Sequence, residues 1–577
     1  MRLHISKSKN SASLYVIKSV YNSKTQSNSS KIVEKLGTET ELREKLDGKD
    51  PYKWANEYIA KLNKKEKENK REILVKYSPT KMMNKDERCS FNGGYLFLQS
   101  LYHQLNIHQI CNEISVKYKF TFHLDSILSR LMYGRILFPS SKLNTCQLSS
   151  SLLEPPDFEL QHVYRALEVI AKESDFIQAS LYKNSLALSK RNDKILYYDC
   201  TNYFFETEEE NGLRQYGPSK EHRTNPIVEM GLFMDGDGIP LAFSIHSGNT
   251  NEQQTLQPLE KQILKDFSLS KFVVCTDAGL SSTQNRKFND IGGRAFITTQ
   301  SIKKLKAHLK EWALDPNGWA LSGSSKSFHL DEVNASFECT SMYQNATFFK
   351  ERWINEDGLE QKLIVTYCMK FKDYQRSIRS RQIERAYHLL QSHPSSIKKS
   401  RQNDYKRFIQ TTNATDDGEI AENNTYSLDQ DIIAKEEAYD GFYGVCTNLE
   451  DDAAAIVKIN HNRWEIEECF RLLKTDFKAR PVFLSRDDRI KAHFTTCFLS
   501  LTLFRYLEKK LNNAFTSSDI LHQLKHMNFY SLQDEGYIPT YTRTDFTDTL
   551  HESFGFRTDY QIIPQKQMEK IFKMTKK

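Results

Sequence analysis

Paired cysteines and long hydrophobic runs are both missing from this 577-residue sequence. The ten cysteines are scattered singly and form no Cys-x-x-Cys pair, so the sequence predicts no structural zinc site, which needs closely spaced ligands. No stretch approaches the ~20 apolar residues that span a bilayer. The N-terminal residues are basic but lack the apolar run of a signal peptide. These absences predict no membrane association, argue against secretion and favour a reducing cytoplasm.

A strong charge imbalance is also missing. The sequence has 81 Lys and Arg against 74 Asp and Glu, and a net charge of +7 is mild for this length. Basic residues do gather in two stretches, Lys61 to Arg88 and Arg376 to Arg407. Either stretch could follow a phosphate backbone, and either could equally be the solvated face of a helix.

The first 190 residues predict two separate parts of a chain long enough for roughly three or four domains. The first part is a hairpin with a polar loop, followed by a helix with Asp50 as its N-cap and Pro51 at its first position. From Gly93 to about Arg191 the apolar spacing is helical throughout. This helical part fits a DNA-contacting module and, almost as well, a plain scaffold bundle.

The pattern changes to strands at Lys194. A short, continuously apolar run around Asp199 is typical of a strand that is buried on both faces. A hairpin with an Asp-Gly turn, a helix, a second buried run that ends on Asp277, and a last strand at 294–298 follow it. The predicted order is strand, hairpin, helix, strand, helix, strand, with one carboxylate on the first strand and another closing the fourth.

Residues 300–440 interrupt this pattern with short strand-like runs, a basic helix and a polar linker from Thr411 to Asn424. Regularity returns with an apolar run from Gly441 to Cys446 and a long helical region to about Leu511. The segment from 512 to 577 is mixed and predicts no role.

Glu467 lies in a predicted helix that has two distinct faces. The apolar face is formed by Ile466, Phe470, Leu473 and Phe477. Arg463, Glu467 and Lys474 share another face, at i, i+4 and i+11. Alone, this pattern favours an exposed helix with ion pairs. The two strand aspartates change the balance, because an aspartate at the end of a buried strand is costly unless it is paired or binds a metal. A third carboxylate beside them would complete an oxygen-ligand site suited to magnesium.

Five short segments around these residues occur in a specific order. They are Tyr197–Tyr203, Tyr216–Lys220, Ser247–Thr250, Thr276–Gly279 and Arg463–Glu467. Together they resemble the DDE transposases of bacterial insertion sequences and, more narrowly, the group with a Tyr-Arg-Glu-Lys signature. The resemblance implies an α/β fold with a ribonuclease H-like catalytic core, a mixed five-stranded sheet with helices. A partly β insertion domain would interrupt that core, and an N-terminal helical DNA-binding region would precede it.

With this resemblance the chain divides into six expected parts. These are a hairpin and basic helix for DNA binding (1–75), a helical DNA-binding domain (76–190), the first part of the core (191–299), the insertion domain (300–440), the second part of the core with the glutamate helix (441–511) and a C-terminal segment (512–577).

The resemblance also assigns roles to single residues. Asp199, Asp277 and Glu467 match the catalytic carboxylates, which would bind two Mg²⁺ ions, with Mn²⁺ as a substitute. Arg463 and Lys474 match positions that hold phosphates of the DNA. The signature tyrosine falls on Asn460, a departure that would weaken this DNA contact or move it to the neighbouring histidine.

The expected activity is that of a bacterial cytoplasmic transposase, associated with the nucleoid when it is bound to DNA. It would bind terminal inverted repeats, cleave phosphodiester bonds with water and join the 3′-hydroxyl ends to target DNA, as a homodimer in the synaptic complex. Two alternatives stay open: a nuclease of the same fold without strand transfer, and a domesticated DNA-binding protein without catalysis. A glycosidase with paired carboxylates would not explain Arg463 and Lys474. Trp312, Trp319 and Trp353 could stack on a flipped base, although a buried structural role is favoured for each.

Overall fold

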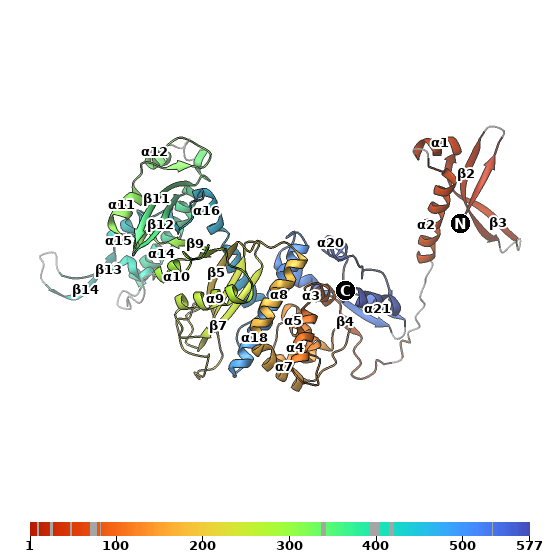
Figure 1. The fold of residues 1–577 in the computed structure, drawn as a ribbon, viewed down its shortest axis with the longest axis horizontal. Coiled ribbons are helices and arrows are strands. Elements are labelled where there is room, and N and C mark those ends of the chain that lie inside the picture. The colour runs from red at the N-terminus through yellow and green to blue at the C-terminus, as the bar shows by residue number, and fades with distance from the viewer. Residues whose placement is uncertain are drawn as a thin grey trace. The chain divides into compact units, whose positions relative to one another are not determined.

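The computed structural model describes residues 1–8, 11–22, 27–46, 49–69, 78–80, 82–335, 342–392, 404–414, 420–532 and 535–577 (Figure 1). These residues form two compact units, Met1–Glu87 and Arg88–Lys577. Parts of both basic stretches, 70–77 and 393–403, lie outside the described residues. Within the described residues, every helix is too short or too polar to cross a membrane.

The N-terminal unit is a three-stranded antiparallel sheet with two helices. Its elements are β1 (Arg2–Lys7), β2 (Ala12–Asn22), β3 (Ser27–Thr38), α1 (Glu39–Lys45) and α2 (Pro51–Asn69). The predicted hairpin is confirmed as β2 and β3, whereas β1 and α1 were not expected. The predicted helix start is also confirmed, because the Asp50 carboxylate accepts a hydrogen bond from the backbone N–H of Tyr52 at 2.9 Å.

The second unit begins with the expected helices, which surround one long central helix (Figure 1). The helices are α3 (Tyr95–Gln104), α4 (Ile107–Lys117), α5 (Leu124–Leu137), α6 (Lys142–Ser149), α7 (Leu160–Lys172), α8 (Ser174–Leu188) and the central α18 (Asp487–Lys510). Because α18 packs against α3, α5, α7, α8 and the main sheet, it is buried along most of its length. The helical part and the sheet therefore share one continuous hydrophobic core.

The main sheet has nine strands in the order β10-β11-β12-β15-β9-β8-β5-β6-β7. They are β5 (Ile195–Phe204), β6 (Ile227–Asp235), β7 (Pro240–Ser247), β8 (Val273–Thr276), β9 (Ala295–Gln300), β10 (Ala320–Leu321), β11 (Phe348–Glu356), β12 (Leu359–Tyr367) and β15 (Phe442–Thr447). The sheet is mixed, because β5, β8 and β9 run parallel while the other pairs are antiparallel. The five strands predicted from 195 to 298 are confirmed and adjacent, in the order β7-β6-β5-β8-β9.

The main sheet is wider than the five strands predicted for the core. Strand β15 pairs with β9, and β12, β11 and β10 continue the same sheet from within the 300–440 stretch. The physical reason is that β9 would otherwise expose an unpaired edge. The rest of this stretch contains α11 (Ala307–Leu314), α12 (Leu330–Ala335), α14 (Met369–Ser392) and α15 (Gln430–Glu437).

The polar stretch from Thr411 to Asn424 is not a plain linker. Strands β13 (Ile409–Ala414) and β14 (Ile420–Leu428) pair antiparallel and hold most of it, and residues 415–419 lie outside the described residues. Its polar composition suits a two-stranded hairpin that is separate from the main sheet.

The C-terminal segment forms a small sheet with the first strand of the second unit. It contains α19 (Ser517–His526), β16 (Asn528–Leu532), β17 (Gly536–Pro539), α20 (Asp545–Phe554), β18 (Ile563–Pro564) and α21 (Gln565–Met574). Strand β16 pairs with β4 (Ser90–Asn92), so that Phe529 lies opposite Phe91 in a four-stranded sheet.

Helices cover both faces of the main sheet beside β5. Helix α8 and α9 (Leu256–Asp266) pack on the face that includes Tyr198 and Cys200. Helices α16 (Ala453–His461) and α17 (Trp464–Arg471) pack on the opposite face, against β8 and β9 and against β5 respectively. Side chains on this second face lie where α17 can reach them.

Candidate active site

Asp199 and Asp277 come together because of the strand register. Strands β5 and β8 are parallel neighbours in which Tyr197 pairs with Cys275, so the residues two positions further on, Asp199 and Asp277, occupy equivalent places. Side chains two apart on a strand point to the same face. That face is the one covered by α16, since the Tyr197 hydroxyl donates to the carbonyl of Ile459 at 3.0 Å. Both aspartates therefore lie on the α16–α17 side of the sheet.

The two aspartates are half-buried and held differently by the backbone. Asp277 Oδ1 accepts hydrogen bonds from the N–H groups of Gly279 and Leu280, each at 3.0 Å. Asp199 Oδ1 accepts one, from the N–H of Cys200 at 2.8 Å. Burial raises the pKa of Asp199 to about 6, and the negative charge of Asp277 adds to the rise while Lys220 opposes it. The pair is therefore a place where negative charge is unfavourable without a cation.

Arg463 connects this pair to Glu467. It is the N-cap residue of α17, and its guanidinium lies 3.8 Å from the carboxylate of Glu467, whose side chain is 60% exposed. Burial alone would lower the pKa of Arg463, but Tyr443 and the carboxylates of Asp199, Asp277 and Glu467 together raise it. The structure thus brings the two aspartates together, and the guanidinium that pairs with Glu467 lies near enough to be affected by both of their charges. Among the described residues, no three Asp, Glu, His or Cys side chains form a group that could hold a metal ion.

Lys474 does not continue the α-helical face of Arg463 and Glu467. The helix changes to a π-helical turn at Leu472–Asp476 (η5), and the wider turn rotates Lys474 away from the position that regular α-helical spacing predicts. Lys474 Nζ lies 3.7 Å from Glu221 and 5.6 Å from the centre of the Tyr203 ring. It therefore belongs to a neighbouring group of charges.

That neighbouring group was not predicted as part of the site. Glu221 lies between Lys474 and Arg480, which both pair with it. Lys220 pairs with Glu252 at 2.8 Å and donates to the carbonyl of Cys200, the residue after Asp199. Lys220 belongs to the segment Tyr216–Lys220, which resembles the family, so the sequence did offer a signal for it. No sequence motif marks Arg480.

The expectation that Asn460 contacts DNA is not supported by its position. Asn460 is 3% exposed, donates to the hydroxyl of Tyr443 at 2.9 Å and accepts from the Cys275 thiol at 3.5 Å. Both ends of its amide are used inside the protein. The exposed His461, whose ring stacks on that of Tyr443 with centroids 6.2 Å apart, remains on the surface of the same helix.

The three tryptophans of the 300–440 stretch differ in exposure. Trp319 is fully buried and donates to the carbonyl of Asp315 at 2.9 Å, as the structural interpretation predicts. Trp312 is half-buried, and Trp353 is 44% exposed, so the prediction of burial is wrong for Trp353. In the second basic stretch, Arg379 is buried and paired with Asp440, a structural role.

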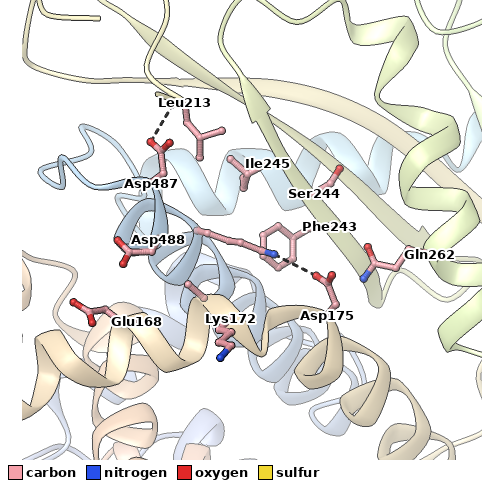
Figure 2. Close-up of a pocket in the computed structure, with 12 residues that line it drawn as sticks. Glu168, Lys172, Asp175, Leu213, Phe243, Ser244, Ile245, Gln262, Asp487 and Asp488 are labelled. Carbon is pink, nitrogen blue, oxygen red and sulfur yellow. Dashed lines mark hydrogen bonds and ion pairs between the residues drawn. The ribbon is translucent and has the colours of Figure 1, made fainter. Parts of the chain in front are cut away.

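A cavity of about 490 Å³ lies away from the carboxylates, between α7, α8, α18 and β7 (Figure 2). The Lys491 ammonium lies 3.5 Å from the Asp175 carboxylate. Figure 2 shows Asp487 beside Leu213, whose backbone N–H it accepts. Its charged groups are of both signs, and none of the predicted site residues lines it.

Comparison with known proteins agrees with the sequence resemblance. A family model described as a transposase DDE domain matches residues 204–503, more than half of the chain, which includes Asp277 and Glu467 but begins after Asp199. A solved structure, the piggyBac transposase synaptic complex with hairpin DNA, is 8% identical and has a TM-score of 0.36, covering 83% of this chain and 84% of its own. That similarity is too weak to support an argument about the site. No curated protein matches the chain.

Proposed function

This chain belongs to the transposase DDE domain family, and on that premise we propose that it cuts DNA at the ends of a mobile element and joins the freed 3′-hydroxyl groups to target DNA. The observation that carries the proposal is that Asp199 and Asp277 meet on neighbouring parallel strands, with Arg463 linking them to Glu467. The DNA substrate would be the terminal inverted repeats, bound by two copies of the chain. The assignment to the group with the Tyr-Arg-Glu-Lys signature is part of the same proposal.

We further propose that β7-β6-β5-β8-β9 is a ribonuclease H-like core. The support is its order, with an antiparallel hairpin on one side of β5 and two parallel strands on the other. The chain leaves this core after β9 and returns through β15, α16 and α17. Residues 300–440 would then be an insertion whose strands extend the core sheet.

We propose that these carboxylates bind a divalent cation such as Mg²⁺ or Mn²⁺. Their oxygens are the ligands that such ions prefer. Burial, and after it the negative charge of Asp277, raise the pKa of Asp199, and a bound cation would offset both effects. Asp199 and Asp277 would hold the metal, and Glu467 would join them by leaving Arg463. When bound, two metal ions would lower the pKa of the attacking water and stabilise the leaving oxygen.

Arg463 would hold a phosphate of the DNA strand at the carboxylates. Its Nε is buried and has no hydrogen-bond partner among the described residues, so it can donate to an incoming phosphate oxygen. A guanidinium bound to phosphate would release Glu467. Lys220, beside Asp199, would reduce repulsion between the carboxylates and the DNA.

The test is to replace the three carboxylates one at a time with alanine. We expect Asp199→Ala, Asp277→Ala and Glu467→Ala each to lower metal-dependent cleavage and strand transfer by at least about a thousandfold, which is about 4 kcal/mol of the barrier, while DNA binding persists. The DNA that flanks the reading frame supplies the candidate end sequences.

Glu468→Ala is the matched control. Glu468 is the next residue of α17 and pairs with Arg471 at 2.6 Å, so its loss should leave cleavage within about twofold. Near-normal cleavage by any of the three variants would overturn that assignment. Supplying DNA with pre-cleaved ends separates a transposase from a nuclease, because only the transposase forms joined product.

A further inference from the structure

A second cavity, of about 290 Å³, has an unusual charge. It lies between the α5–α6 turn, α7, α18 and the segment 478–484 that follows the π-helical turn. Four of its lining residues are lysines or arginines, Arg135, Lys142, Lys478 and Arg480, and His493 adds an imidazole. No lining residue is an Asp or a Glu. We call it the basic pocket.

Lys142 is the most informative residue of the basic pocket. It is 5% exposed, and in the described part of the chain it has neither a carboxylate partner nor a hydrogen bond. Burial, together with the charge of Arg135, lowers the pKa of Lys142 to about 7. An ammonium without a partner in such a place is costly, and an anion that enters the pocket would supply the partner.

The groups around Lys142 leave positive charge uncompensated. Arg135, also 5% exposed, donates to the carbonyls of Phe477, Lys478 and Ser140, and its Nε has no partner among the described residues. Burial and the two neighbouring cations lower the pKa of His493 well below its ordinary value. These neighbours add donors, but none supplies a negative charge.

The N-terminus of α6 adds to the same pocket. Ser141 is the N-cap and accepts the N–H of Asn144, while Lys142 and Leu143 are the first two residues of the helix. The first N–H groups of a helix have no acceptor inside it and favour anions, phosphate above all.

The basic pocket is connected to the carboxylates by further cations. Arg480 lines the pocket and pairs with Glu221, which also pairs with Lys474. Val482, within the same segment, forms a bridge with Phe205, directly after the strand that carries Asp199. Lys220 lies beside Asp199 and close enough to Lys474 to affect its pKa. A DNA backbone that leaves the carboxylates along Lys220, Lys474 and Arg480 would reach the basic pocket.

We propose that the basic pocket binds a backbone phosphate of the DNA strand whose scissile bond lies at Asp199 and Asp277. Arg135, Lys142 and Arg480 receive the phosphate, and Phe483, 68% exposed at the rim, offers a face for the attached base. This inference rests on the proposed function for the identity of the strand. The source of the phosphate, DNA or a free ion, is decided by the test.

The test compares Lys142→Met with Lys142→Arg in the full chain. DNA binding is measured by fluorescence anisotropy with duplex DNA in EDTA, over a range of salt. We expect Lys142→Met to weaken binding about tenfold and to reduce the salt slope by about one, as for a lost phosphate contact, and Lys142→Arg to stay within about threefold. Lys573→Met, an exposed lysine of α21, is the control and should change neither quantity.

Two further measurements keep the outcome decisive. Inorganic phosphate should raise the melting temperature of the wild-type protein by a few degrees over chloride at equal ionic strength, and not that of Lys142→Met. Lys478→Gln, on an exposed side chain, should weaken DNA binding about threefold even if Lys142→Met folds poorly. An unchanged salt slope in folded Lys142→Met overturns the proposal, and phosphate stabilisation with an unchanged slope assigns the pocket to free phosphate.

These measurements do not depend on cleavage. If the Asp199 and Asp277 variants keep their activity, the proposed function fails while the phosphate result still stands. If those variants are inactive and Lys142→Met binds DNA normally, only the basic pocket is reassigned.

Discussion

Two cavities lie beside the same helices, α7 and α18, but they differ in whether their charged residues have partners of opposite sign. In the cavity of Figure 2, Lys491 pairs with Asp175 and Glu168 lies 3.5 Å from Arg489. The lining of the basic pocket contains lysines and arginines but no Asp or Glu, and Lys142 is buried without a partner among the described residues. These charged side chains of the first cavity thus have partners of opposite sign within the protein. The lining of the second contains no acidic residue, and we propose that a bound phosphate supplies the missing negative charge, as expected of a binding site rather than of packing.

The same contrast occurs in the deep interior. Arg191 and Asp235 form a buried pair at 2.6 Å, and the second oxygen of Asp235 accepts two backbone N–H groups. Glu229 is equally buried, but its Oε2 has no partner among the described residues. Balanced and unbalanced buried charges should therefore respond to substitution with opposite signs.

The largest expected effect is on the balanced pair. Asp235→Ala leaves the Arg191 guanidinium buried without its carboxylate, so the free energy of unfolding should fall by about 3–5 kcal/mol. Urea denaturation of the full chain, followed by circular dichroism, measures the loss. A loss below about 1 kcal/mol would mean that Asp235 does not compensate the buried charge of Arg191.

Lys142→Met should act in the opposite direction. Removing an unpaired buried ammonium should raise the free energy of unfolding by about 1–3 kcal/mol at pH 7, although the same change weakens DNA binding. The folded pKa of about 7 lies below the unfolded value, so the wild-type protein regains stability as the pH rises from 7 towards 10. The advantage of Lys142→Met should shrink over that range. An advantage that grows with pH would show that Lys142 is paired in solution.

The parts of the fold that could be predicted are those whose signal is local. Strands β5 and β8 are buried on both faces and therefore read as continuous apolar runs, and the Asp-Gly turn marks the β6–β7 hairpin. Other pairings join residues that are far apart in the sequence, such as β9 with β15 and Phe91 with Phe529. No local sequence pattern predicts such partners. The width of the sheet and the role of the C-terminal strands were missed for this reason.

The candidate site divides in the same way. The meeting of Asp199 and Asp277 follows from where two parallel strands end, and the proximity of Arg463 and Glu467 follows from one helical turn. The displacement of Lys474 depends on a π-helical turn that its sequence does not reveal. The basic pocket was not predictable, because its residues come from four segments that only the tertiary fold brings together.

Glu229→Gln should give a smaller gain than Lys142→Met. Burial and the charge of Glu252 raise the pKa of Glu229 to about 7, above the unfolded value. The wild-type protein therefore loses stability as the pH rises from about 4.5 to 7, because the unfolded state ionises first. Glutamine avoids this loss, and we expect a gain of about 1–2 kcal/mol above pH 7 and none at pH 4, measured by the same denaturation. An equal gain at both pH values would trace the effect to packing.

Lys491→Met should have the smallest effect and defines the lower limit of the comparison. Lys491 and Asp175 are 41% and 56% exposed, so water screens their attraction and the pair contributes at most about 0.5 kcal/mol. Both the free energy of unfolding and the salt slope of DNA binding should stay at wild-type values. A loss of slope here as large as in Lys142→Met would mean that DNA follows the cavity of Figure 2 as well, and that charge balance does not distinguish the two cavities.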